Sequence, residues 1–157
     1  MKKLLLLSLL LTACATTPPP APVAVPDPVG KQDAMLNDLA FYAMSLDGTP
    51  YQWGGESPDS GFDCSGFVRH VFQHSVSLDL PRTSRELSRT GVWVPQAQLH
   101  PGDLVFFNTT SRAYSHVGIY VGEGRFVHAP RVGKNIRVDS VHNDYWRARY
   151  NGARRLL

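Results

Sequence analysis

Apolar residues recur at helical spacing in the first half of the chain, where three helices are expected. Residues 33–46 form an amphipathic pattern that stops at Asp47-Gly48. A second amphipathic helix runs from Cys64 to about Ser75. Residues 83–86 fit a capping box and predict a short helix to about residue 89. The core positions expected on the first helix are Met35, Leu36, Leu39, Ala43 and Leu46.

Strand patterns dominate the second half. Strands are expected over residues 92–94, 104–107, 116–121 and 125–129, with outer strands over 136–138 and 154–157. Residues 49–62 are rich in glycine, proline and aromatic residues and are expected to form a loop. Helices followed by strands predict an α+β domain in which the helices pack on a central antiparallel sheet.

The turn Gly122-Glu123-Gly124 predicts a hairpin with a definite register. If Glu123 is at its centre, Tyr120 lies opposite Phe126 and Gly118 opposite His128. His116 and His128 then share one sheet face as diagonal neighbours, close enough for their side chains to interact. Gly118 leaves room for the His128 ring.

The N-terminal residues are typical of an export signal. Met1-Lys2-Lys3 is basic, and the apolar run 4–11 is too short to span a bilayer. It ends in Leu11-Thr12-Ala13-Cys14, which resembles the lipobox of bacterial lipoproteins and implies cleavage before Cys14 and lipidation of that residue. The alternative is an ordinary secretory signal with a chance cysteine. By the same resemblance, Ala15 favours the outer membrane, with the protein anchored in the bilayer and facing the periplasm.

Residues 14–30 are expected to be a lipidated, proline-rich tether, and residues 31–157 one globular domain. The net charge of +3 includes Lys2 and Lys3. Without them, 16 − 2 = 14 basic residues stand against 13 acidic ones. Such a balance argues against nucleic-acid binding. We expect a monomer.

Cys64 is the most informative residue. Lipidation would consume Cys14, the only other cysteine, and leave an unpaired thiol in an oxidising compartment. At a helix N-terminus its thiolate would be stabilised, and the same backbone N–H groups could hold an oxyanion. A buried structural thiol, or a Cys14–Cys64 disulfide if the lipobox is accidental, are the alternatives. A helix N-terminus that delivers Cys64 to a sheet face carrying His116 as base and His128 as orienting group meets the needs of a cysteine peptidase.

Five ordered motifs strengthen this interpretation: Tyr51-x-Trp53-Gly54-Gly55, Asp63-Cys64-Ser65-Gly66-Phe67, Leu80-Pro81-Arg82, residues 101–106 (PGDLVF) and residues 116–120 (HVGIY). Together they resemble the NlpC-type family of bacterial cell-wall cysteine endopeptidases. The resemblance implies a papain-like fold, a Cys64–His116–His128 triad, no cofactor, and peptidoglycan stem peptides as the partner. The bond implied is that from D-γ-glutamyl to meso-diaminopimelate.

Four further residues are candidates for the oxyanion or substrate site. Tyr51 either helps to hold the oxyanion or is a core aromatic, and Asp63 either contacts substrate or caps the Cys64 helix. Ser65 either contacts substrate or begins the helix. Arg82 either clamps a substrate carboxylate or is solvated. A zinc ion on Cys64, His116 and His128 would block the nucleophile, so no metal is expected.

Two other functions remain open. The same triad would serve an amidase or acyltransferase acting on another substrate, which product analysis would distinguish. A wall-binding lipoprotein with a vestigial triad is the non-enzymatic alternative. The remaining histidines, His70, His74, His100 and His142, fit no spacing with the triad and are expected to be structural or on the surface.

Overall fold

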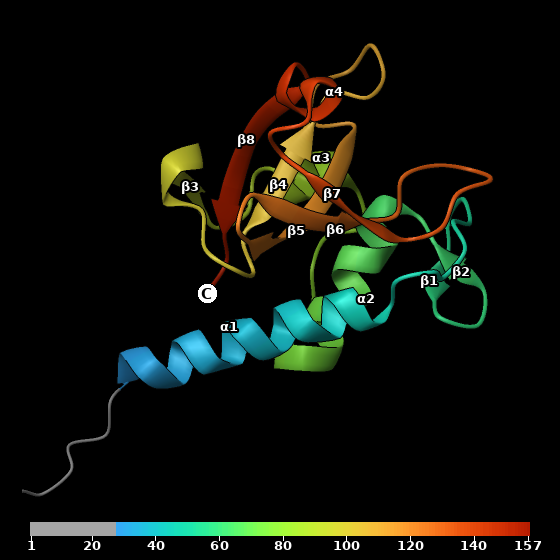
Figure 1. Ribbon diagram of the computed structural model, residues 1–157. Helices are drawn as coiled ribbons and strands as arrows, with labels where there is room; N and C mark the ends of the chain where they lie inside the picture. Colours follow the sequence, from blue (N-terminus) through green and yellow to red (C-terminus); the bar gives the residue numbers. More distant parts are fainter. Residues whose placement is uncertain (1–27) are drawn as a thin grey trace, which may run out of the picture.

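The computed structural model describes residues 28–157, which build one six-stranded antiparallel sheet with helices around it (Figure 1). The strands lie in the order β3-β8-β4-β5-β6-β7. Their bounds are β3 Val92–Val94, β4 Leu104–Phe107, β5 His116–Gly122, β6 Arg125–His128, β7 Arg137–Ser140 and β8 Tyr150–Arg155. The helices are α1 Pro28–Ser45, α2 Cys64–Val76, α3 Ser84–Leu87 and α4 Asp144–Arg147, with a 3-10 turn η1 at Gln96–Gln98. A small separate hairpin pairs β1 Glu56–Ser57 with β2 Gly61–Phe62.

This architecture confirms the expected α+β class and most of the expected elements. Helix α1 begins five residues before the predicted start, because Pro28 is well tolerated in the first turn of a helix. Met35 is 36% exposed, so it is not the core residue that its spacing suggested. The strand expected at 154–157 is β8, which starts at Tyr150 and lies between β3 and β4 instead of outside the sheet. The hairpin β1–β2 and helix α4 were not predicted, since both are too short to show periodicity.

The sheet separates two clusters of buried side chains. On one face, Phe106, Val117 and Ile119 pack with residues of α1 and α2. On the other face, Phe107, Tyr120 and Phe126 pack with Trp146 of α4. His116 pairs with Phe107 and belongs to this second face. Helix α2 therefore packs on the face opposite the histidines, while its first residue, Cys64, lines the same cavity as His116.

The hairpin register agrees with the prediction. Ile119 pairs with Val127 and Tyr120 with Phe126, which brings Gly118 next to His128. A Cβ at Gly118 would lie 2.8 Å from the Val127 carbonyl oxygen and 3.1 Å from the His128 Cβ. Glycine at this position is therefore what allows the His128 ring to lie against β5.

A second glycine brings the start of α2 close to the loop before it. A Cβ at Gly66 would collide with the carbonyl oxygen of Gly55. Close contact between these backbones holds Cys64 in a fixed position beside the end of the sheet. This requirement explains a glycine in the first turn of a helix, where it is otherwise unfavourable.

Within residues 28–157, no helix is long and apolar enough to cross a membrane. The predicted signal, the lipidation site Cys14 and nearly all of the predicted tether lie outside the described residues.

Candidate active site

Cys64 is the first residue of α2 and is half-buried with a free thiol. The N-cap residue Asp63 has extended backbone and accepts a hydrogen bond from the Gly66 N–H at 2.7 Å. Backbone N–H groups of Val117, Ser65 and Cys64 itself act on the sulfur. Because Val117 follows His116 on β5, the thiol is located at the end of the sheet where the imidazole is.

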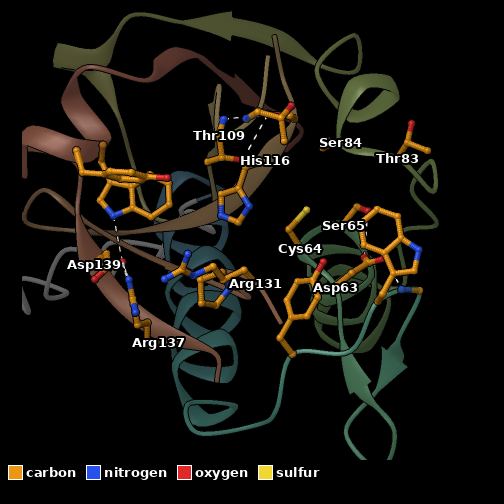
Figure 2. A pocket seen from close by; sticks show the side chains of 18 of the residues that line it. Asp63, Cys64, Ser65, Thr83, Ser84, Thr109, His116, Arg131, Arg137 and Asp139 are labelled. Atoms are coloured by element: carbon orange, nitrogen blue, oxygen red, sulfur yellow. Dashed lines mark hydrogen bonds and ion pairs between the residues drawn. The ribbon is translucent and has the colours of Figure 1, made fainter. Parts of the chain in front are cut away.

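His116 and His128 form a buried, hydrogen-bonded pair. The Nε2 of His116 lies 2.8 Å from Nδ1 of His128, and the two rings are nearly perpendicular. This contact leaves Nδ1 of His116 as the nitrogen available to Cys64, and the side chains of Cys64 and His116 face the same cavity (Figure 2). His128 is completely buried behind His116 and does not line the cavity.

Asp139 extends this pair by one more group. Its Oδ2 lies 2.9 Å from Nε2 of His128. The same oxygen accepts from Arg137 Nε at 3.0 Å, from a terminal nitrogen of Arg137 at 2.8 Å, and from Trp146 Nε1 at 3.0 Å. Trp146 also stacks on His116, with ring centroids 5.5 Å apart. Sequence reasoning missed Asp139 and Trp146, although the alternation Arg137-x-Asp139 places both β7 side chains on one sheet face.

Burial sets the protonation of the two imidazoles. It lowers the pKa of His116 well below the usual value, and the neighbouring His128 lowers it further, while Asp139 acts in the opposite direction. Burial also lowers the pKa of His128, and the hydrogen bond that His128 donates to Asp139 opposes that shift. Although burial opposes it, hydrogen bonding to His128 and Arg137 brings the pKa of Asp139 down to about 2. At neutral pH the site therefore holds two neutral imidazoles and a carboxylate.

The Cys64 thiol is not the pre-ionised nucleophile that its helix position suggested. Burial raises its pKa to about 11, and the Asp63 carboxylate adds to the increase. The three backbone N–H groups lower the pKa but do not outweigh burial. The free protein thus holds a thiol beside a neutral imidazole, a state in which a base must remove the proton when the sulfur attacks.

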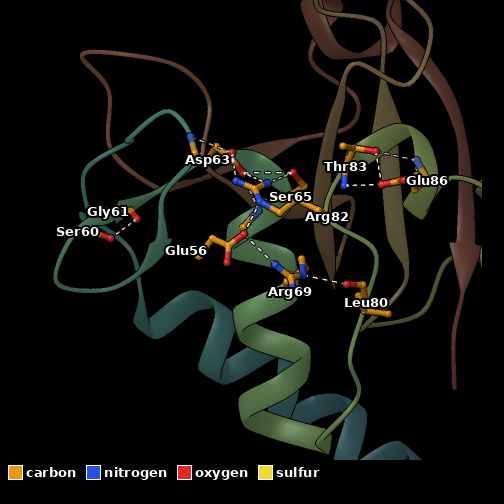
Figure 3. A network of polar contacts seen from close by, with 12 residues as sticks. Glu56, Ser60, Gly61, Asp63, Ser65, Arg69, Leu80, Arg82, Thr83 and Glu86 are labelled. Atoms are coloured by element: carbon orange, nitrogen blue, oxygen red, sulfur yellow. Dashed lines mark hydrogen bonds and ion pairs between the residues drawn. The ribbon is translucent and has the colours of Figure 1, made fainter.

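On the opposite side of Cys64, charged groups form a second network (Figure 3). Arg82 donates to both Asp63 oxygens, at 3.1 and 2.6 Å, and to the Ser65 hydroxyl at 2.9 Å. Its Nε also pairs with Glu56 of β1. Asp63 further accepts from the Gly54 N–H at 3.1 Å. The Arg82 side chain is 36% exposed at the cavity, and its donors to Asp63, Ser65 and Glu56 hold three segments together.

The cavity above Cys64 measures about 880 Å³. Tyr51, Asp63, Cys64, Ser65, Arg82 and His116 all line it, so six of the seven predicted site residues meet there. Burial raises the pKa of Tyr51 to about 12, assisted by Cys64 and Asp63, which keeps the phenol protonated as a donor. The prediction did not include the lining residues Trp53, Arg131, Arg137, Asp139, Tyr145 and Trp146. Trp53 lies within a motif that was recognised and is 80% exposed.

The fold and this cleft define a papain-like α+β domain, as expected. The model of the NlpC/P60 family matches residues 48–155, and the chain belongs to that family. A crystal structure of an NlpC/P60 family protein from Bacillus cereus superposes with a TM-score of 0.72 at 35% identity, covering 78% of this chain and 40% of that one. The NlpC/p60 domain of the peptidoglycan hydrolase SagA gives a TM-score of 0.64 at 34% identity, covering 79% of this chain and 98% of that one.

Two characterised relatives come from Escherichia coli K12. Murein DD-endopeptidase MepH is 45% identical over 117 residues, which are 73% of this chain and 43% of MepH. Murein DD-endopeptidase MepS/Murein LD-carboxypeptidase is 43% identical over 110 residues, 70% of this chain and 57% of the relative. Gamma-DL-glutamyl hydrolase of Bacillus subtilis is 42% identical over 110 residues, 69% of this chain and 26% of that protein. The alignments thus span between 26% and 57% of each relative's length.

Proposed function

We propose that this chain is a cysteine endopeptidase that hydrolyses stem peptides of peptidoglycan. The observation that supports it most is the series of contacts behind Cys64, in which His116 and His128 are hydrogen-bonded at 2.8 Å beside a thiol at a helix N-terminus. Such a series is the arrangement that thiol acyl transfer needs. The names of the relatives support murein as the substrate.

The reaction would proceed through a thioester. As the Cys64 sulfur attacks the amide carbonyl, Nδ1 of His116 accepts the thiol proton. The Cys64 backbone N–H and the protonated Tyr51 hydroxyl stabilise the oxyanion. His116 then protonates the leaving amine, and water attacks the thioester with His116 again acting as base. His128 holds the His116 ring throughout.

The position of Arg131 at the cavity favours a substrate that carries a carboxylate. Arg82, Arg131 and Arg137 line the cavity, and the first and last are engaged by Asp63 and Asp139. Among the described contacts, the Arg131 side chain has no hydrogen bond or ion pair, and Figure 2 draws it at the cavity. Stem peptides carry free carboxylates near their amide bonds, and guanidinium groups bind carboxylates well. We therefore assign the role of carboxylate ligand to Arg131 in place of Arg82.

The bond cleaved is proposed to be that from D-γ-glutamyl to meso-diaminopimelate, with a D,D bond as the alternative that the names of MepH and MepS favour. Digestion of defined muropeptides containing each bond, followed by mass spectrometry, decides between them. The matched control is Cys64→Ser, which keeps the shape of the site. No cleavage of either bond by the wild-type chain, or equal products from wild type and control, would defeat the proposal.

The two alternatives are tested in the same experiment. Products from another amide or from a lipid, with intact muropeptides, would favour a different amidase or acyltransferase. Because the pKa of Cys64 is raised to about 11, slow alkylation at neutral pH does not by itself mark an inactive wall-binding protein. Lipidation of Cys14 is a separate proposal, checked by palmitate incorporation in wild type against Cys14→Ala.

A further inference from the structure

We infer that Asp139 is a positioning residue of the active site, which acts through His128 and fixes the tautomers of both imidazoles so that Nδ1 of His116 is left unprotonated. The inference rests on the proposed function for its catalytic meaning. Its structural content, the tautomer of each ring, can be measured in the absence of any substrate.

The contacts assign every proton in the series. Asp139 is a carboxylate and only accepts, so Nε2 of His128 must donate to it at 2.9 Å. A neutral His128 then has Nδ1 as acceptor, and Nε2 of His116 must donate to it at 2.8 Å. A neutral His116 therefore presents an unprotonated Nδ1 to the cavity. Without an acceptor at Asp139, the His128–His116 bond could form with either ring as donor.

Asp139 itself is held from two sides. Both Arg137 contacts and the Trp146 indole N–H converge on the oxygen that accepts from His128. Trp146 is buried and covers the His116 ring, so one side chain orients both ends of the series. Three donors besides His128 would not converge on this oxygen unless it stayed ionised, which keeps its role as acceptor fixed.

The charge of Asp139 also favours the imidazolium that forms during the reaction. The charged groups that shift the pKa values of the histidine pair are Arg137 and Asp139 from β7, and Cys64 of α2 and Arg131 are further titratable or charged groups that line the same cavity as His116. Arg137 disfavours a protonated ring and Asp139 favours it. Removing only the carboxylate charge should therefore lower the pKa of the pair and shift the acid limb of kcat/KM to lower pH.

A purely structural role is the competing explanation, because Asp139 also ties β7 to α4 through Trp146. Three variants separate the two roles. Asp139→Asn keeps the shape and removes the charge, whereas Asp139→Ala removes the acceptor. Asp144→Asn is the matched control, since Asp144 is exposed on α4 and its side chain pairs, within residues 28–157, only with Arg147.

The first measurement is nitrogen NMR of the histidine rings in the substrate-free protein at neutral pH. We expect Nε2-protonated His116 and His128 in wild type and in Asp144→Asn, and a mixture of tautomers in Asp139→Ala. A wild-type His116 protonated at Nδ1, or an Asp139→Ala spectrum unchanged from wild type, overturns the inference. This result does not depend on whether the chain cleaves murein.

The second measurement is muropeptide hydrolysis below the melting temperature of every variant. Asp139→Asn should lower kcat about tenfold with KM nearly unchanged, and shift the acid limb to lower pH; Asp144→Asn should change none of these. If Asp139→Asn lowers the melting temperature but keeps kcat and the pH profile of wild type, Asp139 is only structural. Failure of all forms to cleave murein would sink the proposed function and leave the NMR result standing.

Discussion

The two walls of the cavity are built on different physical principles. The wall formed by α2 and the loops around it holds Asp63, Arg82 and Glu56 in a compact ion-pair network that is partly open to solvent. The wall formed by the sheet holds His116, His128 and Asp139 in a linear series whose two histidines are almost completely buried. In the first wall charges neutralise one another and fix the backbone of Cys64. In the second, burial keeps the imidazoles neutral and leaves one nitrogen for the proton.

The largest expected effect is a loss of activity when a residue of the sheet wall is substituted. His116→Ala removes the proposed base while Cys64 and its helix stay in place. We expect kcat to fall by about three orders of magnitude or more, because a thiol with a pKa of about 11 is almost entirely protonated at neutral pH. Steady-state kinetics with muropeptides measure kcat of the variant and of wild type. Activity within tenfold of wild type would show that another group accepts the proton.

A substitution in the ion-pair network of the α2 wall should instead lower the free energy of unfolding. Asp63→Ala removes the cap of α2 and the partner of Arg82, Gly54 and Ser65. We expect a loss of about 2 kcal/mol in the free energy of unfolding, measured by denaturant titration. Asp63→Asn, which retains a capping oxygen, is the control and should lose less. An unchanged midpoint for Asp63→Ala would mean that the network does not hold the fold.

Substitution of Arg131 tests its proposed role as the ligand of a substrate carboxylate in the cavity between the two walls. Arg131→Ala should raise KM roughly tenfold for muropeptides with free carboxylates and leave kcat nearly unchanged. With amidated muropeptides the same substitution should have little effect, because no carboxylate is left to bind. A similar loss on both substrates would contradict the assignment. Arg125→Ala is the control, since Arg125 pairs with Glu123 at the exposed hairpin turn.

The smallest expected effect is the shift in the pKa of the Cys64 thiol, which measures the electrostatic difference between the two walls. Ultraviolet titration of the thiolate in a Cys14→Ala protein should give a pKa near 11 for Cys64, against about 8.5 for an unperturbed cysteine. The pKa is raised, so the thiolate fraction should be negligible at pH 7 and grow only in alkaline solution. Ionisation at or below pH 7 would mean that the substrate-free protein holds a thiolate–imidazolium pair.

Prediction from the sequence succeeded where a feature is local. Helix α2 follows from the spacing of its apolar residues, and its capped start fixes the place of Cys64. The register of His116 against His128 follows from the turn around Glu123, since a short turn leaves little freedom in pairing. The capping box at Thr83 was likewise predicted and is present. In each case a few neighbouring residues carry all the information.

Prediction failed where the outcome depends on burial or on partners far along the chain. Nothing in the residues around Arg82 indicates that its donors would be used by Asp63, Ser65 and Glu56. The position of Cys64 at a helix N-terminus suggested a lowered pKa, and only the packed cavity reveals that burial outweighs the backbone N–H groups. Asp139 was missed because the strand expected over 136–138 ended one residue before it, and Trp146 because α4 is too short to show periodicity.

The sequence by itself therefore determined the α+β class and the relative placement of Cys64, His116 and His128, the residues proposed to react, because spacing within a helix and across a tight turn fixes relative geometry. Tertiary structure decided which face α2 covers, which charges cancel, and that Asp139 completes the histidine series. The physical reason is that desolvation and long-range ion pairs exist only after elements distant in sequence have packed, when the surroundings of each charge are finally set.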